Sequence, residues 1–252
     1  MVVRLERHSQ GIHFAMTSPT IIVSNHAKSL TQSLRIIIRN LRINRDGNIE
    51  HCSRQQFFTN PFSTPNWVII EIRNAIDPTL TSYSRAALLL DDGRIVDTDG
   101  VSDPVVSGRS TNSYHVVVIH RNHLGVMSAG LVTLDATATG NEIDFTTTTT
   151  ALFGDGTAAV EIESGVNALH MGNANHTDNV VKFTGSNNDK AFIGIRVNST
   201  VNLTNTVQGY NFEDIDLDGV TSFTGSGNDK AKKGNKLKTT VNLLNCFIEQ
   251  LP

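Results

Sequence analysis

Cysteine is scarce in this sequence. Only Cys52 and Cys246 are present, 194 residues apart. Two cysteines at that separation define no disulfide framework, and neither stands in a C-x-x-C or Cys/His spacing of the kind that binds zinc. Whether the two pair with each other stays open.

Long apolar runs are also missing. No stretch of about 18 apolar residues occurs, so we predict no membrane span. The first residues, MVVRLERHSQGIHFAMTSPT, lack the apolar region of a signal peptide. If the protein is secreted, we expect this chain to be a fragment or to have an unusual start.

Positive charge is lacking in the middle of the chain. Residues 59–164 carry 5 Lys/Arg against 13 Asp/Glu, within a net charge of −3 for the whole chain. Because such a segment repels phosphates, we predict no nucleic-acid partner. Residues 1–58 carry 8 Lys/Arg and 3 Asp/Glu, which favours arginines on a solvated face over contact with an anionic surface.

Catalytic motifs are absent as well. The sequence has no Ser/His/Asp order, no Gly-rich phosphate loop and no paired Glu motif, so we predict that the protein is not an enzyme. His115, His120 and His123 lie close together in the sequence. We interpret Arg121, Asn122 and His123 as the rim of a structured loop that hydrogen-bonds backbone groups.

The chain does contain abundant Asn, Thr and Ser beside 38% hydrophobic residues, a balance typical of β-rich extracellular proteins. Residues 59–150 indicate short strands separated by turns. We predict strands in NWVIIEIRN, in both halves of SRAALLLDDGRIVDTDG around an Asp92-Gly93 turn, and in SYHVVVIHRNH, GLVTLD and NEIDFTT. Strands of this length and spacing predict a mainly β protein with an Ig-like β-sandwich.

The segment before the sandwich, residues 1–58, is harder to interpret. TIIVS (20–24) resembles a strand, and the NRDGN stretch (44–48) resembles a hairpin turn. LTQSLRIIIRNLRI (30–43) fits a helix or a strand, and its β-branched residues favour the strand. We leave the segment unassigned, as β-rich or partly disordered.

The last part of the chain repeats itself. KFTGSNNDKA (182–191) recurs as SFTGSGNDKA (222–231), and TVNLTN (200–205) recurs as TVNLLN (240–245), each 40 residues later. Neither copy is long enough to bury a core alone, so the two should pack on each other. We predict a linker over residues 151–165, followed by a tandem calcium-loop module with short helices over residues 166–252.

The second copy opens with an acidic loop, in which Asp214, Asp216 and Asp218 alternate before Gly219. Ca²⁺ prefers six to eight oxygen ligands, and alternating carboxylates on a tight turn direct several oxygens inward. An EF-hand would place Glu at the twelfth position, where this chain has Gly225, so we predict Asp229 as the closing ligand. The alternative is a solvated acidic turn, whose carboxylates would repel one another.

The first copy carries a reduced version of this pattern. Asn173, Asn175 and Asp178 fill the ligand places with one residue inserted, and Asp189 is the late carboxylate. Fewer charges predict weaker calcium binding in this copy. The basic tract KAKKGNKLK (230–238) after the second loop is interpreted as a solvated helix start.

Several of these stretches together carry a resemblance to a known group of proteins. NWVIIEIRN, SRAALLLDDGRIVDTDGVSDPV, YHVVVIHRNHLGVMSAGLVTL, the two repeats and the terminal EQLP resemble the C-terminal region of large secreted bacterial surface proteins of the hemagglutinin or adhesin-like type. The resemblance covers roughly residues 64–252. The repeats also resemble dockerin type I units, whose paired calcium loops each precede a short helix, although the loop here is longer.

These observations predict a non-enzymatic surface or adhesion module that is stabilised by calcium and located outside the cell or on its surface. Its partner would be a surface glycan or a protein. The alternative is an ancillary docking or carbohydrate-associated part of a secreted polysaccharide-degrading enzyme. The sequence does not determine the oligomeric state.

Overall fold

The computed structural model describes residues 3–8, 11–16, 31–37, 66–90, 92–107, 112–134, 141–198, 201–202, 204–232 and 246–252. The predictions made for residues 20–24 and 44–48, and the question of a Cys52–Cys246 pair, lie outside these ranges. No helix in the described ranges is long and apolar enough to cross a membrane.

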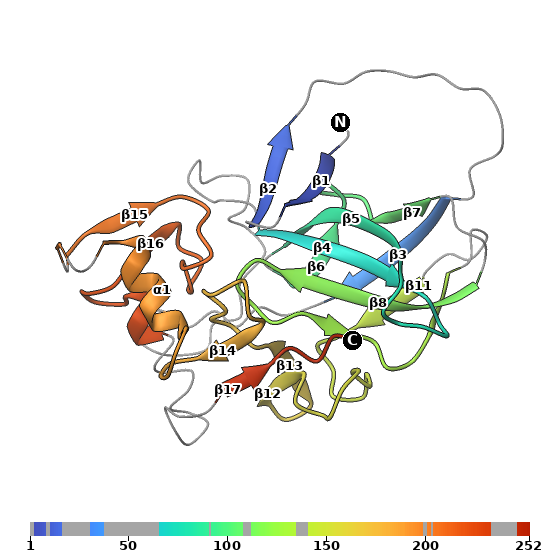
Figure 1. Ribbon diagram of the computed structural model, residues 1–252. Helices are drawn as coiled ribbons and strands as arrows, with labels where there is room; N and C mark the ends of the chain where they lie inside the picture. Colours follow the sequence, from blue (N-terminus) through green and yellow to red (C-terminus); the bar gives the residue numbers. More distant parts are fainter. Residues whose placement is uncertain are drawn as a thin grey trace.

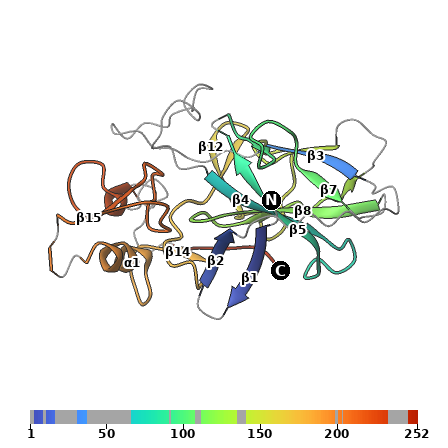
Figure 2. The ribbon, with the colours of Figure 1, turned by 90° about the horizontal axis from the view of Figure 1, so that it is seen from above.

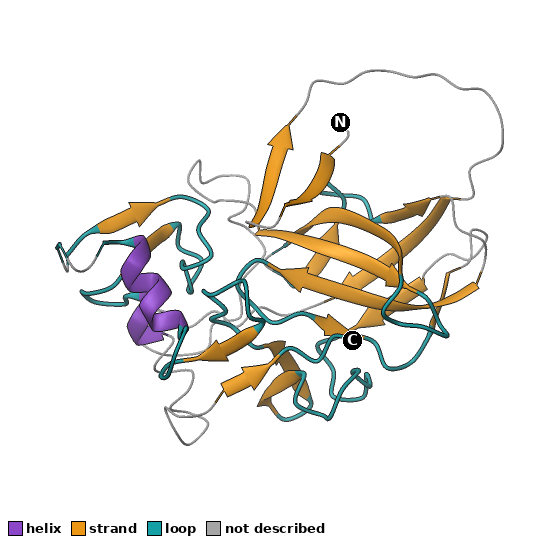
Figure 3. Ribbon diagram, in the orientation of Figure 1, coloured by secondary structure: helices purple, strands orange, loops and turns teal. Residues whose placement is uncertain are grey.

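Most of the described chain before residue 150 forms one curled sheet (Figures 1 and 3). Its strand order is β10 (Val132–Leu134), β8 (Asn112–His120), β4 (Asn66–Arg73), β5 (Thr81–Leu89), β6 (Arg94–Val96), β3 (Thr31–Ile37) and β11 (Asn141–Asp144). β7 (Val105–Ser107) pairs with β3, and β9 (Val126–Met127) pairs with β8. Only β3 and β11 pair in parallel among these strands. The sheet curls until β10 approaches β11.

Side chains that alternate between the two faces of each strand form the core inside this curled sheet. Val68, Ile70 and Ile72 of β4 share one face of the sheet and are at most 1% exposed. Val116 and Val118 of the neighbouring β8 join the same buried cluster. The turn between β5 and β6 has Gly93 at φ 88°, a left-handed conformation that favours glycine.

Two smaller two-stranded sheets are separate from the large one. β1 (Val3–His8) and β2 (Gly11–Met16) form an antiparallel hairpin. β12 (Ala159–Glu163) pairs with β13 (Val166–Leu169), so strand structure occupies part of the segment expected to be a linker. Leu169 of β13 packs into the core of the large sheet.

The repeats form a lobe to one side of the sheet, where Figures 1 and 2 both place α1 and β15. Its elements are β14 (Val180–Lys182), α1 (Asp189–Arg196), β15 (Thr206–Gln208), β16 (Val220–Ser222), a second helix described from Asp229 to Lys232, and β17 (Cys246–Ile248). A small core of Ala168, Met171, Ala174, Ile193 and Ile215 fills the lobe.

The two repeats complete each other by exchanging strands. β15, which follows the first helix, pairs with β16 of the second repeat, whereas β17, which follows the second helix, pairs with β14 of the first. The two pairings have the same register. Gln208 lies opposite Val220, and the residues 40 positions away from them, Ile248 and Val180, lie opposite each other.

The prediction of a mainly β protein is confirmed, and the described ranges contain two short helices. The prediction of a strand in 30–43 is confirmed over the described residues of β3. The Ig-like sandwich is not confirmed, because an Ig-like fold needs two separate sheets and the strands here follow one another in one curled sheet. β3, which belongs to the unassigned segment of residues 1–58, lies inside this sheet together with strands of residues 59–150.

Candidate metal site

The acidic loop of the second repeat is held in shape by backbone conformation. Leu217 and Gly219 adopt φ of 63° and 87°, and this turn sends the chain from the aspartates into β16. Two further glycines, Gly225 and Gly227, have φ of 99° and 71° and return the chain to the second helix. Asn228 begins that helix by accepting a hydrogen bond from the Ala231 amide through its side chain (2.9 Å).

This path brings three carboxylates together. One oxygen from each of Asp214, Asp216 and Asp229 lies within 4.8 Å of the others, which makes this trio the only such group of His, Cys, Asp or Glu side chains in the part of the chain that the structure describes. Two oxygens bound to one Ca²⁺ at about 2.3–2.6 Å lie no more than about 5 Å apart, so the spacing fits a calcium ion. The trio could therefore hold a metal ion.

Asp229 also closes the loop by hydrogen bonds. Its Oδ1 accepts from the Ile215 amide at 2.6 Å, and its Oδ2 accepts from the Ser222 amide at 2.7 Å. Asp189 does the same in the first repeat, where it accepts from the amides of Asn175 and Lys182, each at 2.8 Å. The late carboxylate thus ties loop, strand and helix together in both repeats.

Burial makes the negative charge of the trio costly. Asp214 is 0% exposed and Asp229 is 1% exposed. Burial raises the pKa of Asp229 to about 8, and burial together with the charges of Asp218 and Asp214 raises the pKa of Asp216 to about 6. Burial also raises the pKa of Asp214, although Arg121 opposes this. A bound cation would relieve all three effects by favouring the ionised carboxylates.

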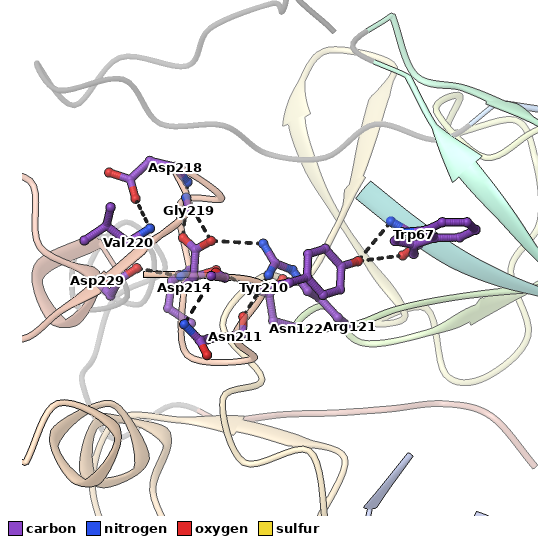
Figure 4. Close-up of polar contacts among 12 residues, drawn as sticks. Trp67, Arg121, Asn122, Tyr210, Asn211, Asp214, Asp218, Gly219, Val220 and Asp229 are labelled. Carbon is purple, nitrogen blue, oxygen red and sulfur yellow. Dashed lines mark hydrogen bonds and ion pairs between the residues drawn. The ribbon is translucent and has the colours of Figure 1, made fainter. Parts of the chain in front are cut away.

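Arg121 reaches Asp214 from the loop that follows β8, as Figure 4 shows. Its Nη2 lies 3.0 Å from Asp214 Oδ2, and the two side chains are 5% and 0% exposed. Its Nη1 donates to the carbonyl of Asn211 (2.9 Å), and its guanidinium lies over the Tyr210 ring at 3.9 Å. The Tyr210 hydroxyl in turn accepts from the Trp67 amide of β4. The sheet therefore supplies one counter-charge to the trio.

The neighbouring residue, Asn122, fixes both repeats to the same loop. Its side-chain amide donates to the Asp214 carbonyl, and its own carbonyl accepts from the amides of Gly172 and Asn173. The interpretation of residues 121–123 as a loop that bonds backbone is confirmed for Asn122 and Arg121. His123 adds an isolated β-bridge to Met171.

Lys232 supplies a second counter-charge from the second helix. Its Nζ lies 3.9 Å from Asp216 Oδ2, with the lysine side chain 6% exposed. The basic tract was expected to be solvated, and this residue of it is buried instead. Asp218, the remaining predicted ligand, lies outside the trio on an exposed position, where it accepts from the Val220 amide (2.8 Å).

The predicted ligands of the first repeat are engaged differently. Asn175 accepts from the Thr177 hydroxyl (2.7 Å), and Asp178 pairs with Lys182 Nζ (2.8 Å). Asn173 is buried, with no hydrogen-bond partner for its Oδ1. A constant shift of 40 residues, without an insertion, places Ala174 opposite Asp214 and His176 opposite Asp216.

The same shift of 40 residues shows a sequence signal for the role of Lys232, which was not recognised from the sequence. It places Phe192, which packs against the small core of the lobe, opposite Lys232. A lysine at a position that is apolar in the other copy predicts a buried partner. Arg121 had no comparable signal, because its acidic partner is 93 residues away in the sequence.

Comparisons of the chain with protein-family models, with curated proteins and with solved structures gave no match.

Proposed function

We propose that this chain is a non-enzymatic extracellular surface or adhesion module whose repeat pair is stabilised by Ca²⁺ at Asp214, Asp216 and Asp229. The observation that carries the proposal is the buried trio, because three carboxylates with oxygens within 4.8 Å of one another offer a hard cation several oxygen ligands at once. Asp218 adds a fourth negative charge close by, since it raises the pKa of both Asp214 and Asp216.

Location outside the cell is consistent with such a site. Calcium sites in extracellular modules bind in the range of about 10⁻⁴–10⁻³ M, and two counter-charges inside the protein, Arg121 and Lys232, favour binding at the weak end. Calcium would then strengthen the lobe. A glycan or protein partner would be bound by the assembled surface rather than by the ion.

Thermal unfolding of the full chain tests the metal site. With Ca²⁺ at 100 times its dissociation constant, stability rises by about 2.7 kcal/mol, which corresponds to about 5–10 °C for a chain of this size. Asp216→Asn should remove the calcium-induced shift, because it takes one charge from the trio. Asp103→Asn, which removes an exposed carboxylate elsewhere, should leave the shift intact. Mg²⁺ should act more weakly, because it demands tight octahedral geometry.

Equal melting temperatures in calcium and in chelator would show that the trio is an acidic turn without a stabilising ion. A full shift in Asp216→Asn would place the bound ion elsewhere. Binding to immobilised glycans and to host-surface proteins, measured with and without calcium, tests the adhesion proposal. Turnover of a glycan or peptide substrate by the purified chain would contradict its non-enzymatic character.

A further inference from the structure

Lys232 is unusual because a buried ammonium points at the acidic trio from the helix that also carries Asp229. The side chain is 6% exposed, and its Nζ lies 3.9 Å from Asp216 Oδ2. A buried lysine is stable in its charged form only when an acidic partner compensates for the lost hydration. Asp216, whose side chain is 13% exposed, provides that partner.

The trio is thus faced by charges of opposite sign on two sides. Arg121 approaches Asp214 from the sheet, and Lys232 approaches Asp216 from the second helix. When all three carboxylates are ionised they bear a formal charge of −3 and the two tethered cations bear +2, so most of that charge is balanced within the chain. A divalent ion that entered the trio would meet both cations at short range.

The first repeat supplies an independent comparison within the same chain. At the positions 40 residues earlier, Asp214 is replaced by Ala174, Asp216 by His176 and Lys232 by Phe192. Asp229, by contrast, is matched by Asp189, which closes the loop in the same way. The lysine is therefore present in the copy that has the two loop acids and absent from the copy that lacks them. The loop-closing acid alone does not require it.

We infer that Lys232 is a tethered counter-ion of Asp216 that competes with divalent cations for the trio and so sets how tightly they bind. The inference deepens the proposed function and rests on the same three carboxylates. Like charges a few ångströms apart repel strongly in a poorly hydrated site. A divalent ion must therefore either bind against this repulsion or displace the ammonium from Asp216, and both routes weaken binding.

Calorimetric titration of the full chain with CaCl₂ tests the inference. Lys232→Met keeps the length and apolar stem of the side chain and removes the charge. We expect it to tighten calcium binding by about tenfold or more, because the competing charge is gone. Lys232→Arg keeps the charge and should bind as weakly as the unaltered protein. Lys230→Met is the matched control, because Lys230 lies on the same helix and contacts the Phe223 ring (4.6 Å) instead.

The outcomes separate this inference from the proposed function. If the unaltered chain binds calcium and Lys232→Met binds it with the same or lower affinity, the inference is overturned and the proposed calcium site stands. Binding by Lys232→Met alone supports the inference and overturns calcium binding by the natural chain, because the lysine would then fill the trio by itself. Binding by neither protein overturns both. If Lys232→Met folds only when CaCl₂ is present, as followed by circular dichroism, the inference is supported.

Discussion

The ion pair between Arg121 and Asp214 should be the strongest single polar link between the sheet and the repeats. We predict that Arg121→Met destabilises the protein by about 3–5 kcal/mol, the range observed when one partner of a buried ion pair is removed. Both side chains are almost fully buried, at 5% and 0% exposed. Methionine replaces the apolar stem, so the loss arises from the uncompensated carboxylate, the missing bond to Asn211 and the missing contact with Tyr210.

Urea unfolding in the presence of chelator measures this loss without compensation by a bound cation. Asp214→Asn in the Arg121→Met background should restore part of the stability, with a coupling of at least about 1 kcal/mol in the double-mutant cycle. The control is Arg94→Met, which removes an ion pair with Asp92 whose two side chains are 34% and 24% exposed, and it should lose less than about 1 kcal/mol. The reasoning is refuted if Arg121→Met is no more harmful than Arg94→Met and the two changes in the cycle are additive.

Two further predictions concern the loop backbone and a buried histidine. Gly219→Ala should lower stability by about 1–2 kcal/mol, because the φ of Gly219 is 87°. Gly219→Asn should lose less, since Asn179 occupies the equivalent position of the first repeat with φ 51°. Urea unfolding midpoints compare the two variants, and equal losses of stability would contradict the argument. Burial, with a smaller contribution from Arg121, lowers the pKa of His120 to about 3. The unfolded chain therefore protonates His120 near pH 6.5, whereas the folded chain does not. Stability consequently falls as pH decreases below 6.5. Between pH 7 and 5 the unaltered protein should therefore lose about 2 kcal/mol more than His120→Gln, and parallel stability curves for the two proteins would rule this out.

Local sequence patterns were sufficient for most strands of the sheet, although β7 and β9 were not predicted. Val68, Ile70 and Ile72 alternate with less buried residues, and this period of two residues determines which face is buried whatever the partner strands are. The Asp92-Gly93 pair likewise specifies its turn from local backbone preference. The number of sheets was not available from such patterns, because it depends on which strands pair. The parallel contact of β3 with β11 joins segments about 100 residues apart in the chain.

In the candidate site too, features set by local sequence were predicted, whereas others were not. The clustering of Asp214, Asp216 and Asp229 follows from spacing within one loop and its return to a helix, and these three residues were named from the sequence. The first repeat was aligned with an insertion that the constant 40-residue shift does not need, so Asn173 and Asn175 were matched with Asp214 and Asp216 in place of Ala174 and His176.

The counter-charges were missed for a related reason. Arg121 shows no sign of its partner in the sequence, because it meets Asp214 only through tertiary packing. Arg121 was interpreted as part of a loop rim and Lys232 as part of a solvated helix start, and the fold places both beside carboxylates of the trio.

The exchange of strands between the repeats has a consequence for the order in which the lobe assembles. The paired residues Gln208 and Val220 are 12 positions apart, whereas Val180 and Ile248 are 68 positions apart. Closing the longer loop costs about 1.5 kcal/mol more in chain entropy, so β15 and β16 should pair first. On the ribosome, at about 5–20 residues per second, β14 would wait about 3–13 s after its own synthesis before its partner strand is made. The strand pair that contains β16 of the second repeat would therefore form before the pair that contains β14 of the first, and the pairing of β17 would complete the lobe.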